Sequence, residues 1–131
     1  MKILIAEDDS TSRLLLQELL KSYGPVHTAV NGREAVAAVR LALKDGEPYD
    51  LICLDIMMPK MDGQEALAAI RRIETADGVA GSNRTKIVMT TALADRENVM
   101  EAVAGKCDDY LIKPIQKAKL LEALHRLALI A

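Results

Sequence analysis

The chain has 131 residues, a formal net charge of -2, 50% hydrophobic residues and 27% charged residues. Its length is typical of one domain, and its apolar content predicts a packed core rather than a disordered chain. The near-balanced charge provides no basic field, which argues against sequence-independent nucleic-acid binding and against a polybasic membrane patch. The only aromatic residues are three tyrosines, so the chain lacks a stacking platform for bases or for a flat cofactor ring.

The N-terminus and the cysteines both predict a reducing, cytoplasmic setting. The segment MKILIAEDD has an apolar run that is too short, and too quickly followed by acids, for a secretory signal or a membrane span. Cys53 and Cys107 lie far apart and match neither a CxxC redox pair nor a zinc cluster. We therefore expect two structural thiols.

Short apolar runs alternate with longer segments of helical periodicity along the whole chain. The runs are continuous in Ile, Leu and Val, which is typical of parallel strands that helices cover on both faces. The expected fold class is therefore α/β, with a (βα)5 doubly wound five-stranded parallel sheet. The predicted strands are Ile3–Ala6, Val26–Val30, Leu51–Leu54, Lys86–Thr90 and Asp108–Ile112.

Five apolar stripes at helical spacing predict five helices between and after these strands. Turn residues support two of the helix starts, because Asn31-Gly32 precedes the second stripe and Asp62-Gly63 precedes the third. The stripes comprise, in chain order, Leu15, Leu16, Leu19 and Leu20; Ala35, Val36, Val39 and Leu43; Leu67, Ile70 and Ile73; Val99 and Val103; and Leu120, Leu121, Leu124 and Leu127.

The segment Thr75–Thr85, with the sequence TADGVAGSNRT, is the one long polar stretch that contains glycine. We expect an exposed loop there, which is either a spacer or an element that helps to choose a partner. No repeat and no linker divides the chain. We therefore expect residues 1–131 to form one domain with no attached output domain, either as a natural stand-alone protein or as a piece of a longer one.

Acidic side chains follow the first predicted strand directly. Glu7, Asp8 and Asp9 are more acids than the start of a helix needs, because Ser10 or Thr11 can cap it alone. Carboxylates that converge on one crevice raise one another's pKa unless a cation lies among them. A few carboxylates that leave room for water ligands are typical of a Mg²⁺ site.

Other chemically active residues lie at the ends of the third, fourth and fifth strands, and ligands of an open parallel sheet bind at these carboxyl ends. Asp55 follows the third strand, Thr90-Thr91 the fourth and Lys113 the fifth. A divalent cation and a lysine can neutralise a phosphoryl group while a hydroxyl orients it. Asp55 is then able to act as the nucleophile.

Four segments carry a resemblance to a known family: ILIAEDD, LICLDIMMPKMDG, VMTTA and DDYLIKP. Each lies at the expected strand end, and together they follow the order of the family. Over essentially its whole length the chain resembles the receiver domains of bacterial two-component response regulators, of the stand-alone chemotaxis-regulator type. The resemblance implies a flavodoxin-like strand order 2-1-3-4-5.

The resemblance also implies a phosphoacceptor and a Mg²⁺ site. Asp55 is the implied phosphoacceptor and a metal ligand. Asp8 is an implied direct ligand, Glu7 a ligand through water, and the backbone carbonyl of Met57 the remaining protein ligand.

A second group of implied roles belongs to the switch. Thr91 is the implied switch hydroxyl, although Thr90 is an alternative that the sequence leaves open. Lys113 pairs with a phosphoryl oxygen, and its bond to Pro114 is expected to be cis. Tyr110 is the implied aromatic residue whose rotamer follows Thr91, with ordinary packing as the alternative.

Such a domain takes a phosphoryl group from a phosphohistidine on a histidine kinase or a histidine phosphotransfer protein. It then signals by binding a downstream protein, so we expect a phosphoacceptor switch rather than an enzyme, with no direct contact with DNA or membrane. Apolar Met57 and Leu93 predict slow loss of the phosphoryl group, because neither orients a water molecule. Exposed members of the expected readout face are Arg96, Glu97, Met100 and Lys117.

Three other functions share parts of this pattern. A flavodoxin-like electron carrier is disfavoured, because the acids after the first strand repel a flavin phosphate and no aromatic residue is placed to stack the ring. A phosphohydrolase with an aspartyl nucleophile needs a second carboxylate where Met57 stands. A receiver-like docking module that works without phosphorylation stays open as the main alternative.

Overall fold

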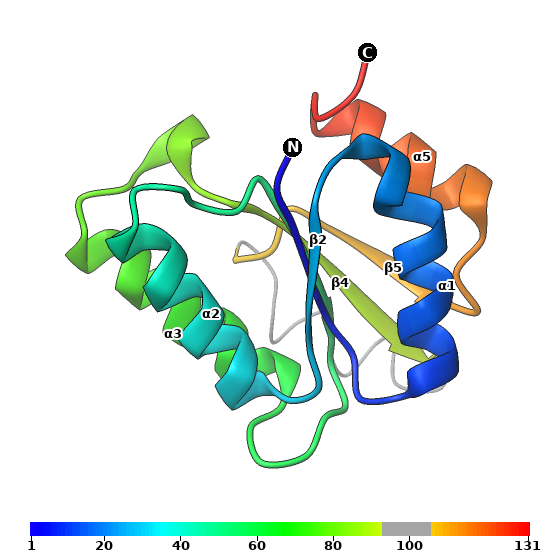
Figure 1. The fold of residues 1–131 in the computed structure, drawn as a ribbon, viewed down its shortest axis with the longest axis horizontal. Helices are drawn as coiled ribbons and strands as arrows, with labels where there is room; N and C mark the ends of the chain where they lie inside the picture. The colour runs from blue at the N-terminus through cyan, green and yellow to red at the C-terminus, as the bar shows by residue number, and fades with distance from the viewer. Residues whose placement is uncertain (93–105) are drawn as a thin grey trace.

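The computed structural model describes residues 1–92 and 106–131. Its strands are β1 (Ile3–Ala6), β2 (Val26–Ala29), β3 (Leu51–Asp55), β4 (Lys86–Ala92) and β5 (Asp109–Lys113). They form one parallel sheet in the order β2-β1-β3-β4-β5 (Figure 1). The expected sheet and its strand order are confirmed, and each strand lies within two residues of its predicted bounds.

The described helices are α1 (Ser10–Leu20), α2 (Gly32–Lys44), α3 (Gly63–Ala76) and α5 (Lys117–Arg126), with short 3-10 turns η1 (Lys21–Tyr23) and η2 (Gly81–Asn83). No helix in these ranges has both the length and the apolarity to cross a membrane. Several predictions concern residues outside the described part of the chain, namely Leu93, Arg96, Glu97, Val99, Met100 and Val103.

The sheet separates two apolar clusters. Helices α2 and α3 cover one face and α1 and α5 the other, at the left and right of Figure 1. Alternation along β1 and β3 divides their residues between the faces. Leu4, Ile52, Leu54, Ile70 and Met89 belong to the cluster under α2 and α3, and Ile3, Ile5, Leu16, Leu51 and Leu124 to the other.

Both cysteines are free thiols. Cys53 is 1% exposed in the core under α1 and α5, and burial raises the pKa of its thiol to about 12. Cys107 is partly buried against the opposite cluster. Both side chains pack against apolar clusters, which fits the prediction of structural thiols.

Side-chain caps fix the starts of α1, α2 and α3. The carboxylate of Asp62 accepts a hydrogen bond from the Glu65 backbone at 2.9 Å, within a capping box. Asn31 caps α2 in the same manner, so both predicted starts are confirmed. Asp9, rather than Ser10 or Thr11, caps α1, so one of the three acids after β1 serves the start of this helix.

The segment Thr75–Thr85 is only in part the exposed loop that its composition predicts. Helix α3 continues through Ala76, and the far end of the segment is anchored in the core. Thr85 is 6% exposed, its hydroxyl donates to the Tyr49 carbonyl at 2.8 Å, and its N–H donates to Glu74 at 2.8 Å. The prediction failed at the first end because α3 runs into the segment. It failed at the other end because the contacts of Thr85 are long-range and leave no local signal.

A buried polar network ties α3 to the amino-terminal edge of the sheet. The guanidinium of Arg71 donates to the Glu74 carboxylate at 2.7 Å and to the Asp108 carboxylate at 2.9 Å. It also donates to the carbonyls of Thr85 and Lys106, at 2.9 and 2.8 Å. Because Glu74 is only 1% exposed, its charge depends on Arg71 for compensation.

We predict that Arg71→Met lowers the free energy of unfolding by about 3 to 5 kcal/mol, because it leaves a buried carboxylate unpaired. Urea denaturation followed by circular dichroism measures the change. The neighbouring exposed residue provides the control: Arg72→Met should change the stability by less than about 0.5 kcal/mol. Equal losses in the two variants would contradict a structural role of the Arg71 network.

Candidate functional site

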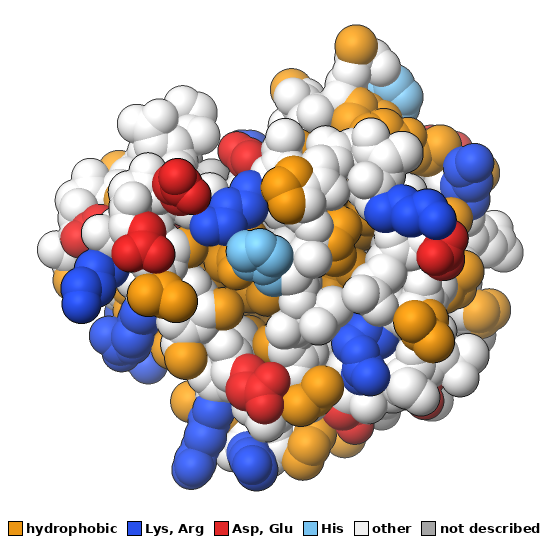
Figure 2. All heavy atoms as spheres, viewed as in Figure 1, with side chains coloured by type: hydrophobic (Ala, Val, Ile, Leu, Met, Phe, Trp, Pro, Cys, Tyr) orange, Lys and Arg blue, Asp and Glu red, His pale blue; other side chains and the backbone are white. Residues whose placement is uncertain are grey.

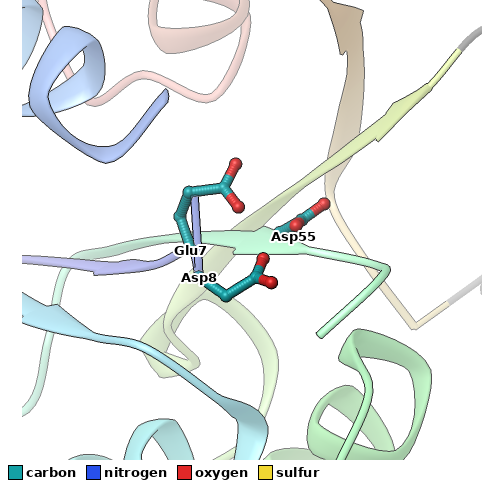
Figure 3. Close-up of side chains that lie close together, drawn as sticks. All are labelled: Glu7, Asp8 and Asp55. Carbon is teal, nitrogen blue, oxygen red and sulfur yellow. The ribbon is translucent and has the colours of Figure 1, made fainter. Parts of the chain in front are cut away.

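The strand ends bring three acidic side chains together. Glu7 and Asp8 follow β1 and Asp55 ends β3; these are neighbouring parallel strands, so both segments leave the sheet at its carboxyl edge. One oxygen from each carboxylate lies within 4.8 Å of the others. Figure 3 shows the three carboxylates gathered at this edge. The predicted acidic cluster is therefore present as a spatial group.

The cluster is unevenly exposed. Glu7 and Asp55 are 1% and 4% exposed, whereas Asp8 is open to solvent. Burial, followed by the hydrogen bond with Asp55, raises the pKa of Glu7 despite the opposing effect of Lys113. Two buried acids thus lie beside a third that faces water.

Lys113 joins the two buried acids. Its Nζ lies 2.6 Å from Glu7 Oε1 and 3.1 Å from Asp55 Oδ1. Burial alone lowers the pKa of this lysine, but the hydrogen bond to Glu7 and the charge of Asp55 outweigh burial and raise it. Lys113 therefore stays cationic at the end of β5.

This donor set fits a hard divalent cation. Glu7, Asp8 and Asp55 offer only oxygen ligands, and one lysine opposes their three carboxyl groups. The exposed position of Asp8 leaves one side of the cluster open, so water ligands have room to stay on the ion. Few carboxylates combined with retained water suit Mg²⁺ better than Ca²⁺.

The backbone around Asp55 is held by the start of α3. The N–H of Ile56 donates to the Thr90 carbonyl at 3.1 Å, and the N–H of Gly63 donates to the Ile56 carbonyl at 2.8 Å. A Cβ at Gly63 would lie 2.2 Å from the carbonyl oxygen of Asp55. Glycine at this position thus allows α3 to begin directly against the strand end that carries Asp55.

The strand register places the side chains of the two threonines at the end of β4 on opposite faces of the sheet. Thr90 pairs with Asp55 in the β3-β4 ladder, and Met89 pairs with Tyr110 in the β4-β5 ladder. Alternation places Thr91 on the face of Met89 and Tyr110, where Tyr110 packs against the cluster under α2 and α3. Thr91 is 2% exposed, and its hydroxyl donates to the Ala92 carbonyl at 3.2 Å. The arrangement favours Thr91 as the hydroxyl coupled to Tyr110.

Other predicted positions lie around this cluster. Met57 is 66% exposed in the segment between β3 and α3, and the ligand role of its carbonyl stays a prediction. The peptide bond between Lys113 and Pro114 is cis, as expected. Lys117 is exposed at the start of α5. Met57 thus follows the end of β3, and Pro114 and Lys117 follow the end of β5.

Sequence reasoning missed two contributors. Arg13 Nη1 donates to the carbonyl of Glu7 at 2.9 Å and so braces the acidic segment against α1. Gly63 was predicted only as a helix start, although its lack of a side chain sets the approach of α3 to Asp55. A spacing of six residues and a single glycine are both too common in sequences to reveal these contacts.

Comparison with known proteins identifies the family. The family model described as "Response regulator receiver domain" matches residues 3–125. The chain is 30% identical over 129 residues to the chemotaxis protein CheY of Thermotoga maritima, and the match covers 97% of each chain. It is 37% identical over 129 residues to part of the hybrid signal transduction histidine kinase G of Dictyostelium discoideum, where it spans 96% of this chain but only 4% of the kinase.

Solved structures agree in fold. The receiver domain of the sensor histidine kinase PA1611 from Pseudomonas aeruginosa, which holds magnesium in its active site cleft, is 31% identical with a TM-score of 0.74 over 96% of this chain and 95% of that one. CheY in the CheX-CheY-BeF3-Mg²⁺ complex from Borrelia burgdorferi is 25% identical with a TM-score of 0.82, over 100% and 90% of the chains.

A third match involves a phosphotransfer complex. The receiver domain of Saccharomyces cerevisiae Ssk1, solved with the histidine phosphotransfer protein Ypd1, is 28% identical with a TM-score of 0.77, over 93% of this chain and 84% of that one. The chain belongs to the response regulator receiver domain family. Its function therefore lies in two-component phosphorelay signalling.

We predict that Gly63→Ala lowers the free energy of unfolding by about 3 kcal/mol, because the added methyl group would overlap the carbonyl oxygen of Asp55. Urea denaturation measures the loss. The adjacent variant Gln64→Ala, on the same helix, should stay within about 0.5 kcal/mol of the parent. If Gly63→Ala were equally benign, the proposed contact between α3 and the strand end would not matter.

Proposed function

We propose that this receiver domain is a phosphorylation-activated switch in which Asp55 accepts a phosphoryl group from a phosphohistidine. The observation that carries the proposal is the buried Asp55 carboxylate, whose oxygen lies 3.1 Å from the Nζ of Lys113. Glu7 and Asp8 complete the acidic cluster around it. A nucleophile, a fixed cation and a divalent-cation site are the three parts that phosphoryl transfer needs.

The metal ion proposed here is Mg²⁺. Asp8, Asp55 and the backbone carbonyl of Met57 would hold it directly, and Glu7 would hold it through water. When bound, Mg²⁺ neutralises negative charge on the phosphoryl group. The oxygen donors of the cluster and the exposure of Asp8 support this assignment.

In the proposed reaction, an oxygen of the Asp55 carboxylate attacks the phosphorus atom of a phosphohistidine. The phosphorus–nitrogen bond breaks, and its electron pair stays on the imidazole nitrogen, which takes a proton from solvent. Lys113 stabilises the charge on the transferred group by electrostatic attraction. The chain would thus catalyse the transfer of the phosphoryl group onto its own Asp55, with the phosphohistidine as donor.

Phosphorylation would change the charge at Asp55 from -1 to about -2 and add three strong acceptors. The Thr91 hydroxyl would exchange its hydrogen bond to the Ala92 carbonyl for one to a phosphoryl oxygen. The ring of Tyr110 would then enter the space that Thr91 leaves. The result is a shift between two arrangements of one surface, which a partner protein distinguishes.

We propose two classes of partner in a reducing, cytoplasmic compartment. A histidine kinase or a histidine phosphotransfer protein would supply the phosphoryl group, in line with the Ypd1 complex of the related Ssk1 receiver domain. A downstream protein would read the phosphorylated state, in line with the CheX complex of the related CheY. The two free cysteines support the choice of compartment.

We predict that acetyl phosphate with Mg²⁺ adds the mass of one phosphoryl group to the parent protein and none to Asp55→Asn. Intact-mass spectrometry measures the addition. Asp45→Asn is the matched control, because Asp45 is an exposed acid at the end of α2, and this variant should be phosphorylated normally.

Modification of the Asp55→Asn variant would contradict the assigned acceptor. If no variant were modified, NMR spectra with beryllofluoride and Mg²⁺ would decide the matter. Spectral changes around Asp55 in the parent protein only would support the phosphoacceptor, and unchanged spectra would favour a docking module that works without phosphorylation.

We predict that Met57→Asn shortens the lifetime of the phosphorylated protein by about tenfold, because an amide can orient the hydrolytic water and a thioether cannot. The rate of phosphate release after removal of acetyl phosphate measures the lifetime. Lys60→Asn is the matched control in the same loop, since Lys60 has a φ of 67°, which asparagine tolerates. An unchanged lifetime for Met57→Asn would contradict this account of slow dephosphorylation.

A further inference from the structure

Helices α2 and α3 pack side by side and leave a groove between them at the surface. The groove has a volume of about 580 Å³. Its residues lie in the middle and C-terminal turns of the two helices and just after α3. They are Arg40, Leu43, Lys44, Ala69, Arg72, Ile73, Ala76 and Asp77.

The groove has an apolar floor. Leu43, Ala69 and Ile73 are half-buried, and Ala76 continues the apolar strip to the end of α3. The two alanines have small side chains, so the strip lies lower than its flanks. A surface of this shape buries apolar side chains of a ligand without any rearrangement of the helices.

The rim of the groove is basic. Arg40 and Lys44 lie one turn apart on α2, Arg72 lies opposite on α3, and all three are exposed. Asp77 is the one acid among the lining residues that the structure describes. At the left of the molecule, Figure 2 shows Lys and Arg side chains beside hydrophobic ones, with Asp and Glu side chains above them. This local positive charge contrasts with the net charge of -2 of the chain.

The rim cations have no ion-pair partner among residues 1–92 and 106–131. Some other cations of the protein do: Arg71 is bound to Glu74 and Asp108, and Lys119 lies 3.8 Å from Glu122. Arg71 and Arg72 are neighbours in sequence, yet Arg71 is buried and bonded to Glu74, whereas Arg72 is exposed. The rim is therefore available to carboxylates of a partner.

A second hollow continues this surface on the other side of α3. It has a volume of about 480 Å³ and shares Arg72 and Ala76 with the groove. Exposed Lys106 adds a further cation there. Apolar and basic surface thus extends across both sides of the C-terminal half of α3.

We propose that the groove between α2 and α3 binds an acidic amphipathic helix of a partner protein. The apolar stripe of such a helix would lie on the floor formed by Leu43, Ala69 and Ile73, as in other helix-in-groove complexes. Carboxylates beside that stripe would pair with the rim cations. Complementary charge of this kind selects the partner and accelerates its association.

The proposed docking surface is separate from the acidic cluster. Helices α2 and α3 begin at the carboxyl edge of the sheet, where Asp55 lies, and end at the opposite edge. Arg40 and Arg72 have no part in the proposed phosphoryl chemistry. The groove therefore gives the protein a second interface that does not depend on Asp55.

The probe is a fluorescein-labelled peptide of about five helical turns, with Leu at positions i, i+3, i+4 and i+7 and Glu beside this stripe. Fluorescence anisotropy of the peptide with the full chain measures binding. We expect saturable binding, at least about tenfold weaker for a matched peptide with Lys in place of each Glu. NMR chemical shifts of the labelled protein should change along α2 and α3.

Charge reversal tests the rim itself. Arg40→Glu/Arg72→Glu should weaken binding at least about tenfold. Lys21→Glu/Lys119→Glu changes the net charge equally at two other exposed sites and should leave binding within about twofold of the parent. Circular dichroism and phosphorylation by acetyl phosphate should be unchanged in both double variants, which separates this surface from the function of Asp55.

The following results would overturn the proposal: no saturable binding, equal binding of both peptides, equal weakening by both double variants, or shifts confined to other elements. Competition by a single-stranded oligonucleotide at equal strength would also overturn it, because the surface would then bind polyanions in general.

Discussion

Two buried carboxylates share one lysine at the carboxyl edge of the sheet, and the strands of the sheet hold these three side chains together. Burial of Glu7 and Asp55 is unfavourable without a fixed cation, and Lys113 lies 2.6 and 3.1 Å from their oxygens. A flexible scaffold would let these side chains separate into water. The three residues stay together because β1, β3 and β5 belong to one parallel sheet, in which β1 and β3 are buried along their whole length.

The opposite edge of the sheet has a different kind of polar network. Arg71 meets two carboxylates and two carbonyls, so its donors are well matched there. The carboxyl edge instead places one lysine against three carboxyl groups. A satisfied network rigidifies its surroundings, whereas an excess of like charge responds to an added cation or phosphoryl group. The Arg71 network thus stabilises one edge of the sheet, and the acidic cluster at the other edge responds to a bound cation or phosphoryl group.

The parts of the structure that the sequence predicts are those with a local signal. Strands covered on both faces read as continuous apolar runs, and the acids after them locate the cluster at Glu7 and Asp55 without further information. The anchoring of Thr85 had no such signal, because it depends on Tyr49, 36 residues away. The preference for Thr91 over Thr90 rests on the strand register, which the sequence does not show, since both threonines are almost fully buried.

Acidic and basic side chains gather at different places on this protein, although its net charge is only -2. The acids at the carboxyl edge are mostly buried, so salt screens their interactions weakly, whereas the cations of the α2-α3 groove are exposed and are screened within about 10 Å at 0.1 M salt. Interactions at the two places therefore differ in their dependence on ionic strength. A partner held by Arg40 and Arg72 would dissociate as salt rises, while the attraction between Lys113 and Asp55 would persist. A change in ionic strength therefore distinguishes binding at the groove from the interactions of the acidic cluster, without any substitution in the protein.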